Sequence, residues 1–407
     1  MVEPIEIQEG FKQTDAGIIP NDWSAPVLSE ISDFENGKAH EQFIDDKGDY
    51  IVVNSKFIST EGRVAKFSKE NLSPLTKGDI AIVMSDIPNG KALAKCFFID
   101  KDNRYTLNQR IGCIKPNADM DNDYLFYKLN RNKYFLAFDS GSGQTNLKKS
   151  EILACPVALP PTKDEQTAIA TAIKNTDELI KQLEKQLIKK RNIKIGAMQE
   201  LLKPKEGWIE NTLGETATLK ARIGWQGLTT AEYRKTGEYY LITGTEFENG
   251  FIDWSSCFYV DEERYKQDRN IQVKEHDVLV TKDGTIGKIA LIKSVPKPAT
   301  LNSGVFVIRP IANSFHPEFF YYLLLSEVFL QFLAQLSAGS TINHLYQKDF
   351  VTFKYFTPKT IDEQKHIAKI LSDMDNEITE LEIKLKKYKM IKQGMMQNLL
   401  TGKIRLV

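Results

Sequence analysis

The strongest constraint on the fold of this chain is a motif that occurs twice. Residues 162–170 read TKDEQTAIA and residues 360–368 read TIDEQKHIA, an offset of 198 residues. The match continues without a gap at the same offset and pairs, for example, Asp177 with Asp375. Self-similarity at a fixed offset is typical of chains built from repeated structural units. We therefore expect two copies of one unit.

A long helix is predicted after each copy of the motif. Pro161 and Pro358 precede the two copies, and the acidic residues that follow suit the positive end of a helix dipole. Apolar residues then recur every three or four positions, as in paired helices. The predicted helix-pair core consists of Ile173, Ile180, Leu183 and Leu187 in the first helix and of Leu371, Met374, Ile378, Leu381 and Leu385 in the second. Each helix runs for roughly 40 residues, or about 60 Å at 1.5 Å per residue.

The segments ahead of each helix match more loosely but in the same order. TLNQRIGCIKP at 106–116 corresponds to TLNSGVFVIRP at 300–310, and KGDIAIVMSD at 77–86 to EHDVLVTKDG at 275–284. Short β-branched and aromatic runs predict strands, and an amphipathic helix follows them in each half. These strand runs lie at 50–58, 79–84, 239–247 and 277–281, and the two helices near 122–138 and 317–336.

These patterns predict an α+β fold with a pseudo-two-fold internal repeat. Two globular mixed domains are expected to be separated by a two-helix antiparallel coiled coil, because a two-fold axis is the closed arrangement of two like units. The predicted division is a first domain at 1–160, including an N-terminal segment at 1–20, a helix at 161–205, a second domain at 206–357 and a helix at 358–407.

Motifs of common enzyme classes are missing from the sequence. It has no phosphate-binding G-x-x-x-x-G-K-[ST] loop, no H-E-x-x-H and no G-x-S-x-G. The stretch DGTIGK at 283–288 has the wrong spacing for a phosphate loop and predicts a turn between two strands. The five histidines and four cysteines show no metal-ligand spacing, so we predict no catalytic or metal site and expect buried cysteines.

Charge and hydropathy bear on location and partners. The N-terminal MVEPIEIQEG does not resemble a secretory signal, and FFYYLLL at 319–325 is too short to span a membrane, so we expect a cytoplasmic protein. Lysine plus arginine equals aspartate plus glutamate at 54 each. A nucleic-acid binder usually carries a basic excess, although a neutral chain still presents a basic face when its charges are segregated.

The duplicated P-x(2–3)-D-E-Q-x-x-I-A motif, the long helices and the variable domain ahead of each resemble the specificity subunit of type I restriction-modification enzymes. The segments SGSGQTNLKKSEI at 140–152 and SAGSTINHLYQKDF at 337–350 are similar to the family's approach to its helices. The resemblance covers essentially the whole chain. It implies a non-catalytic subunit whose two domains each read one half of a bipartite, asymmetric DNA target, while the paired helices set the spacer between the halves.

The resemblance also implies partners and cofactors. Double-stranded DNA and two modification subunits are expected partners, with restriction subunits joining where the system has them. S-adenosylmethionine is expected on the modification subunits, and ATP and Mg²⁺ on the restriction subunits. No cofactor is expected on this chain.

Loop residues able to hydrogen-bond to base edges or phosphates are the candidate DNA contacts. In the first domain they are Lys38, His40, Asn89, Lys91, Asn108, Gln109, Arg110, Ser142, Gln144 and Thr145. In the second domain they are Arg222, Trp225, Gln226, Lys282, Ser303, Ser340, Thr341, Asn343 and His344.

Two alternatives stay open at this point. One is a two-domain coiled-coil scaffold that does not bind DNA, for which the zero net charge is the best support. The other is the recognition part of a related methyltransferase-nuclease system.

Overall fold

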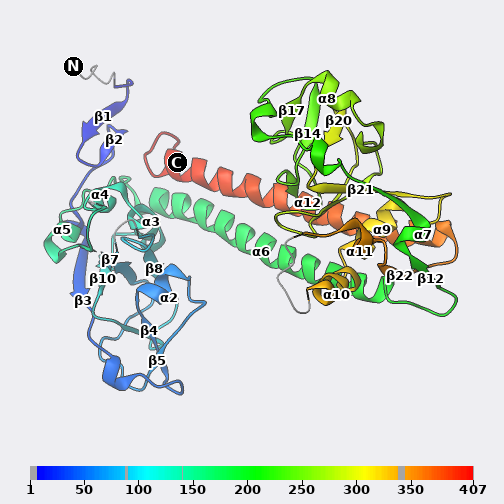
Figure 1. Ribbon diagram of the computed structural model, residues 1–407. Coiled ribbons are helices and arrows are strands. Elements are labelled where there is room, and N and C mark those ends of the chain that lie inside the picture. Colours follow the sequence, from blue (N-terminus) through cyan, green and yellow to red (C-terminus); the bar gives the residue numbers. More distant parts are fainter. Residues whose placement is uncertain (1–6, 88–89, 140, 338–343, 407) are drawn as a thin grey trace. The chain divides into compact units, whose positions relative to one another are not determined.

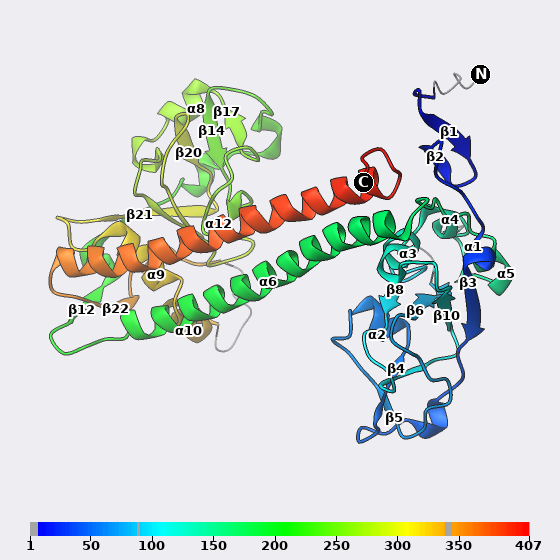
Figure 2. The same ribbon diagram turned by 180° about the vertical axis from the view of Figure 1, so that it is seen from behind.

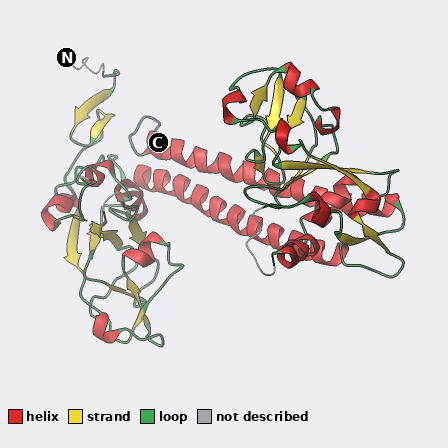
Figure 3. Cartoon of the chain, viewed as in Figure 1, coloured by secondary structure: helices red, strands yellow, loops and turns green. Residues whose placement is uncertain are grey.

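The computed structural model describes residues 7–87, 90–139, 141–337 and 344–406 (Figure 1). The chain forms two compact units, here called unit 1 (Met1–Glu184 with Ile383–Val407) and unit 2 (Lys185–Glu382). Both long helices contribute to both units, so the domain boundaries drawn from the sequence stay predictions. Each unit mixes strands with helices (Figure 3).

Unit 1 contains a four-stranded sheet in the order β3-β10-β6-β8 and a three-stranded sheet in the order β5-β4-β9. Its buried core lies between these sheets, the short helices and the start of the long helix α6. The strands are β1 Phe11–Thr14, β2 Gly17–Pro20, β3 Ser32–Asn36, β4 Tyr50–Val53, β5 Phe67–Ser68, β6 Ile80–Val83, β7 Ser85–Asp86, β8 Cys96–Phe98, β9 Tyr105–Leu107, β10 Ile111–Pro116 and β11 Thr145–Asn146. The short helices are α1 Leu28–Ile31, α2 Ser55–Ser59, α3 Asn122–Leu129, α4 Lys133–Leu136 and α5 Lys149–Leu153.

Unit 2 repeats this topology with sheets β13-β21-β18-β19 and β17-β14-β20. The parallel pair β4–β9 of unit 1 corresponds to β14–β20, and the turn after β18 joins it to β19, as predicted for DGTIGK. The strands are β12 Ile209–Thr212, β13 Ala217–Lys220, β14 Tyr239–Ile242, β15 Phe247–Glu248, β16 Phe251–Ile252, β17 Phe258–Val260, β18 Val278–Thr281, β19 Ile289–Leu291, β20 Ala299–Leu301, β21 Val305–Pro310 and β22 Lys354–Thr357. The short helices are α7 Leu213–Thr216, α8 Glu262–Lys266, α9 Pro317–Leu324, α10 Glu327–Leu336 and α11 Gln347–Phe350.

The two long helices are α6 Lys163–Leu201 and α12 Ile361–Leu399, labelled in Figures 1 and 2. Ion pairs within each unit show that they run antiparallel. In unit 1, Asp177 and Glu184 of α6 pair with Lys392 and Lys389 of α12. In unit 2, Lys190 and Lys194 of α6 pair with Glu377 and Asp375 of α12.

The apolar residues predicted for the helix-pair core point inward. Ile173, Ile180, Leu183, Leu187, Leu371 and Ile378 are buried, and Met374, Leu381 and Leu385 are partly buried. The first turns of each helix also join the core of the domain ahead of them. Ile173 packs into the unit 1 core and its repeat counterpart Leu371 into the unit 2 core.

Four sequence predictions of elements were wrong in detail. The single helix expected near 122–138 is two helices, α3 and α4, because the Asn132 side chain accepts from the Tyr134 N–H at 2.9 Å and so caps α4. The strand run expected over 239–247 ends at Ile242 and resumes as β15, because Glu246 accepts from the Thr243 and Gly244 N–H groups in a turn between them.

The other two corrections have the same kind of cause. The strand expected over 50–58 ends at Val53, because the Asn54 side chain accepts from the Phe57 N–H at 2.9 Å and so caps α2. The single helix expected over 317–336 is two helices bent by 57°, since Ser326 caps α10 after α9 has ended. Asparagine and serine side chains bond to nearby backbone N–H groups and so end or start a helix or strand. The periodicity of apolar residues does not reveal where this happens.

No single helix among the described residues is long and apolar enough to cross a membrane, and only the bent pair α9–α10 passes such a test together. Every residue of α9 from Phe319 to Leu324 is buried in the unit 2 core. These apolar residues therefore serve the packing of unit 2.

All four cysteines are buried, as predicted. Burial raises the pKa of Cys155 and of Cys257 to about 12 and raises those of Cys96 and Cys113 further. Unfolding exposes these thiols, which then titrate near pH 8.5. The unfolded chain thus loses protons that the folded chain keeps, so the free energy of unfolding falls as pH rises above that value.

We expect a lower free energy of unfolding at pH 10 than at pH 8, measured by urea denaturation in reducing buffer. Buried tyrosines such as Tyr355, whose pKa burial raises to about 12, act in the same direction near pH 10. A variant with Cys155→Ala and Cys257→Ala should lose part of this pH dependence. Equal pH profiles for the variant and the unchanged chain would contradict the assignment to the thiols.

Candidate nucleic-acid interface

In unit 1, polar loops meet where the central strand β6 ends. The Met84 N–H donates to the Arg110 carbonyl at 3.2 Å, and the Leu147 N–H donates to the Met84 carbonyl at 2.8 Å. Immediately after Met84, Ser85 of β7 pairs with Asn146 of β11. The turn at 108–110 and the returning segment at 144–146 therefore flank one point, which we call reading locus 1.

Reading locus 1 presents an oriented amide side chain. Gln144 Nε2 donates to Ser85 Oγ at 2.7 Å and lies 3.4 Å from Asn146 Oδ1. Gln144 and Asn146 are both exposed. Glutamine and asparagine amides pair in a bidentate manner with the N6 and N7 edge of adenine, so the locus has the chemistry of a base reader.

The loop at 36–41 is held against the same turn. The Lys38 N–H donates to the Leu107 carbonyl at 3.0 Å, and Gln109 Nε2 reaches Glu41 Oε1 at 3.3 Å. A Cβ at Gly37 would lie 2.1 Å from the Asn108 carbonyl oxygen, which explains why glycine stands there. The structure thus gathers the predicted residues Lys38, Asn108, Gln109 and Arg110, of which all but Asn108 are exposed.

Unit 2 builds the same locus with different side chains. The Lys282 N–H donates to the Gly304 carbonyl at 2.8 Å, and the Leu345 N–H donates to the Lys282 carbonyl at 2.8 Å. These bonds are the counterparts of those at Met84, because Lys282 and Leu345 stand 198 residues after Met84 and Leu147. We call this point reading locus 2.

At reading locus 2, an Asp–His pair replaces the serine and the amides. His344 Nδ1 forms a hydrogen bond with Asp283 Oδ1, and both side chains are partly exposed. A carboxylate on Nδ1 orients the imidazole and favours a proton on that nitrogen. His344 Nε2 is then left to bond to an outside group.

A hollow of about 410 Å³ opens beside the Asp283 side chain. Its wall includes the hydroxyl groups of Thr245, Thr285 and Ser303 and the ammonium of Lys288. Donors and acceptors thus converge from the turn after β18, the 302–304 turn and the segment after β14. Of the candidate DNA contacts, Ser303 lines this hollow. Lys282 stands in sequence between the lining residues Thr281 and Asp283, and its ammonium lies 5.2 Å from the Phe306 ring centroid.

Two predicted DNA contacts are wrong, because their side chains lie in the interior. His40 is 1% exposed and bonds to Thr106 Oγ1 at 2.7 Å through Nε2. Arg222 is also 1% exposed and donates to the Leu301 carbonyl at 2.9 Å and to Thr300 Oγ1 at 3.2 Å. Thr300 of β20 is the repeat counterpart of Thr106 of β9. His40 and Arg222 therefore bond to equivalent strands in the interior of their units.

The remaining candidates divide by position. Thr145 is 8% exposed, and its hydroxyl donates to Asp139 Oδ1 at 3.2 Å. Its side chain therefore stabilises the segment that carries Gln144 and Asn146. Lys91 and Ser142 are exposed, and Gln226 is partly buried. Trp225 belongs to the short 3-10 helix Gly224–Gln226. Asn89, Ser340, Thr341 and Asn343 lie outside the described residues.

Sequence reasoning missed Ser85 and Asn146 at locus 1 and Asp283, Thr245 and Lys288 at locus 2. A signal for the serine and the aspartate was present. Aligning KGDIAIVMSD with EHDVLVTKDG places Ser85 opposite Asp283 directly after an apolar strand. A position where two copies of one scaffold carry different polar residues is a candidate for specificity.

The DEQ motif fixes each recognition domain to the start of a long helix. Gln166 Oε1 accepts from the Asp121 N–H at 2.9 Å, and Gln364 Oε1 accepts from the His316 N–H at 2.7 Å. Asp121 and His316 are the N-cap residues of α3 and α9, so each glutamine bonds to the start of a neighbouring helix. Both glutamines are buried.

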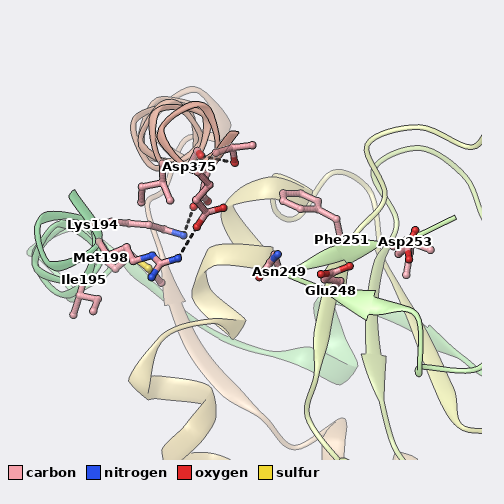
Figure 4. Close-up of a pocket in the computed structure, with 13 residues that line it drawn as sticks. Lys194, Ile195, Met198, Glu248, Asn249, Phe251, Asp253 and Asp375 are labelled. Atoms are coloured by element: carbon pink, nitrogen blue, oxygen red, sulfur yellow. Dashed lines mark hydrogen bonds and ion pairs between the residues drawn. The ribbon is translucent and has the colours of Figure 1, made fainter. Parts of the chain in front are cut away.

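A second duplicated contact joins each domain to both long helices. In unit 1, Asp177 accepts from the Tyr127 hydroxyl at 3.0 Å and pairs with Lys392 at 2.6 Å. In unit 2, Asp375 accepts from the Tyr322 hydroxyl at 2.8 Å. Asp375 also pairs with Lys194 at 2.5 Å (Figure 4). The lysine ammonium also lies over the tyrosine ring, 5.9 Å from its centroid in unit 1 and 5.5 Å in unit 2. We call these contacts the unit 1 lock and the unit 2 lock.

Comparison with known proteins agrees with this geometry. The family described as type I restriction modification DNA specificity domain matches residues 20–190 and again residues 205–388. The chain belongs to this family. Its two matched segments contain one reading locus each, which confirms the resemblance drawn from the DEQ repeats.

Full-length members of the family align over nearly the whole chain. The type I restriction enzyme MjaVIII specificity subunit of Methanocaldococcus jannaschii is 26% identical over 98% of this chain and 97% of that protein. The MjaIX specificity subunit of the same organism is 25% identical over 97% of this chain and 96% of that protein. Membership confirms a DNA sequence-specificity subunit with no catalytic activity.

Solved structures share the fold. The S subunit of a type I restriction-modification system from M. genitalium superimposes with a TM-score of 0.65 at 16% identity, over 97% of this chain and 98% of that one. A second structure, described as showing complex assembly and conformational transition of the type I R-M system, gives a TM-score of 0.55 at 14% identity, over 95% and 99%. The likeness confirms the predicted α+β fold class with two repeated domains.

Proposed function

We propose that reading loci 1 and 2 each read one half of a bipartite DNA target, and that the two halves differ in sequence. The observation that carries this proposal is the duplicated backbone scaffold with unlike side chains. The same pair of backbone bonds builds both loci, yet one presents Ser85, Gln144 and Asn146 and the other Asp283 and His344. Different donor and acceptor patterns select different bases.

The partners follow from the family. DNA and the other subunits of a type I complex are the partners, and we propose two modification subunits, with restriction subunits in complete systems. S-adenosylmethionine would then be held by the modification subunits, and ATP and Mg²⁺ by the restriction subunits. Among the described residues of this chain, no cluster of histidine, cysteine and acidic side chains is suited to hold a metal ion. A cytoplasmic location suits all of these partners.

Binding to a duplex library randomised over the target tests the reading of two half-sites. The full complex should enrich two separated and unlike sequence blocks, and its affinity should fall steeply as salt rises, because phosphate contacts release counterions. Enrichment of no sequence would favour the alternative of a scaffold that does not read DNA. Methylation by the purified chain alone would instead favour the methyltransferase-nuclease alternative.

We further propose that α6 and α12 set the spacer between the half-sites. Antiparallel ion pairs occur in each unit, as a continuous helix pair would require. Glu184 of α6 pairs with Lys389 of α12, so insertions after Leu183 and after Lys389 are at the same level and keep the register of the helix pair. Four residues at each position add about one turn, or 6 Å, to each helix. The expected result is a spacer longer by one or two base pairs at about 3.4 Å each.

The spacer is read from the position of the two sequence blocks in the enriched library. A control with four residues inserted at the Glu61–Gly62 loop turn should keep the original spacer. An unchanged spacer in an active complex with lengthened helices would overturn the role of the helices.

A further inference from the structure

Unit 1 contains an open groove of about 1060 Å³ apart from reading locus 1. Four parts of the chain line it. They are the turn of the β1–β2 hairpin at 15–17, the segment 127–134 around the start of α4, Pro156, and the last turns of α12 with the tail at 389–403. Figure 1 labels β1, β2, α4 and α12 and marks the C-terminal end of the chain with the letter C.

The charges that line this groove are strongly unequal. Six cationic side chains lie on its wall, against one carboxylate, that of Asp15. The cations are Lys128, Arg131, Lys133, Lys389, Lys392 and Lys403. Lys389 and Lys392 are paired with Glu184 and Asp177, and no carboxylate among the described residues pairs with the other four. The groove therefore carries a net positive charge.

Lys128 is a partly buried cation of this groove. Its Nζ donates to the Leu400 carbonyl at 2.7 Å, and burial lowers the pKa of its ammonium to about 8. Placing an ammonium in a poorly solvated position costs free energy unless a negative group compensates it. An anion bound in the groove would supply that compensation.

Part of this charge is specific to unit 1. Tyr127 and Tyr322 are counterparts through their locks, so the next residues, Lys128 and Leu323, are counterparts as well. The first residues of α4 and α10 follow the N-caps Asn132 and Ser326, and they are Lys133 and Glu327. Unit 2 thus carries an apolar and an acidic residue where unit 1 carries two lysines.

We propose that this groove binds the phosphodiester backbone of nucleic acid, as a contact without sequence preference that unit 1 makes and unit 2 does not. The inference rests on the proposed DNA function and adds to it a second surface. Phosphates are contacted by arginine, lysine and amide side chains, and the wall holds three asparagines and two glutamines in addition to its cations. A docked acidic protein would call for an apolar interface core. Cations and amides together make up eleven lining residues, whereas six are apolar or aromatic: Ala16, Tyr127, Tyr134, Pro156, Met396 and Leu400.

The groove also accounts for DNA binding by a chain of zero net charge. Positive charge is gathered in one concave surface, where a low-dielectric wall strengthens its field. The overall balance of 54 basic and 54 acidic residues does not show this local excess.

The test removes two exposed lysines of the groove that form no ion pair with the described part of the chain, as Lys133→Gln with Lys403→Gln. The full complex is titrated with a target duplex and with a scrambled duplex of equal length at several salt concentrations. Each lost phosphate contact lowers the slope of log K against log salt by roughly 0.9. We expect a slope lower by up to about 2 and an equal loss of affinity for both duplexes, with unchanged base preferences.

The matched control is Lys101→Gln with Lys205→Gln. Both lysines are exposed, Lys205 is the repeat counterpart of Lys403, and neither lines the groove. This control should keep the full slope. An unchanged melting temperature shows that both variants fold.

The outcomes separate this inference from the function on which it rests. If the unchanged complex prefers the target and the groove variant keeps its full salt slope, the groove proposal is wrong and the proposed function stands. If neither duplex is preferred but the groove variant lowers the slope, the groove stands and sequence reading fails. Normal DNA binding combined with loss of co-purifying modification subunits would assign the groove to an acidic protein surface and overturn the proposal.

Discussion

Replacing Gln144 with alanine is expected to relax base preference in one half of the target and to leave the other half unchanged. Ser85 and Asn146 hold this exposed amide, so its loss removes a preorganised contact and leaves the fold intact. A good bidentate contact to a base discriminates by about 1–3 kcal/mol, so we expect roughly a 5- to 150-fold loss of preference at one base pair.

His344→Ala should give the mirror result in the other half. The substitution removes the imidazole that Asp283 orients. Because the two loci lie in different units and are built from different residues, their effects on binding free energy should add in the double variant. The measurement is enrichment from the randomised library, compared position by position.

Gln199→Ala is the matched control, because Gln199 is an exposed glutamine on α6 that belongs to neither locus. It should leave every base preference unchanged. Uniform weakening of all sequences by Gln144→Ala, without a change in preference, would mean that this amide contacts phosphate. Relaxation of the same half by both variants would contradict the assignment of one locus to each half.

The largest stability effect is expected at the two locks. Asp375→Ala removes one carboxylate that Lys194 and Tyr322 share, and the Asp375 side chain is 19% exposed. Removing one partner of a fully buried pair costs about 3–5 kcal/mol, and this partial exposure reduces the expected cost to about 2 kcal/mol. Asp177→Ala should behave alike in unit 1, where Lys392 and Tyr127 lose their partner.

Urea denaturation measures this loss as a change in the free energy of unfolding. A double-mutant cycle with Asp375→Ala and Lys194→Ala isolates the coupling between the two side chains. Lys369→Ala with Asp373→Ala is the matched control, because that pair is exposed and spans one turn of α12. A coupling energy in the lock as small as that of this surface pair, below about 0.5 kcal/mol, would contradict the role of the lock.

Each lock should also affect the base preference of the reading locus in its own unit. The aspartate connects α3 or α9 to both long helices, and these short helices pack on the sheets that end in the loci. Tyr322→Phe should therefore cost about 1 kcal/mol in stability, the value of one hydrogen bond, and weaken preference in one half-site. Tyr127→Phe should do the same for the other half-site.

Much of this architecture was readable in the sequence because it depends on periodic or repeated patterns. The DEQ repeats marked the starts of α6 and α12 to within a few residues, since acidic caps and spacing by three and four residues are local signals. The buried thiols, the turn at 283–288 and the apolar stripe of the long helices followed from the same kind of local reasoning.

The candidate site was predicted less well, because exposure is a property of the folded chain. His40 and Arg222 stood in glycine-containing polar loops, yet both side chains turn inward to bond to the threonines of β9 and β20. Asp283 looked like a turn residue until the fold placed it against His344, 61 positions further along the chain. No local pattern encodes such a pairing.

The sequence by itself determined that the chain has two copies of one α+β unit, where its long helices begin, and the family to which it belongs. These features depend on short-range periodicity and on a repeat that survives divergence. Only the tertiary structure decided which polar side chains reach the surface and which stay inside. It alone gathered Lys128, Lys133 and Lys403 into one groove of a neutral chain, because charge density depends on distances between residues far apart in sequence.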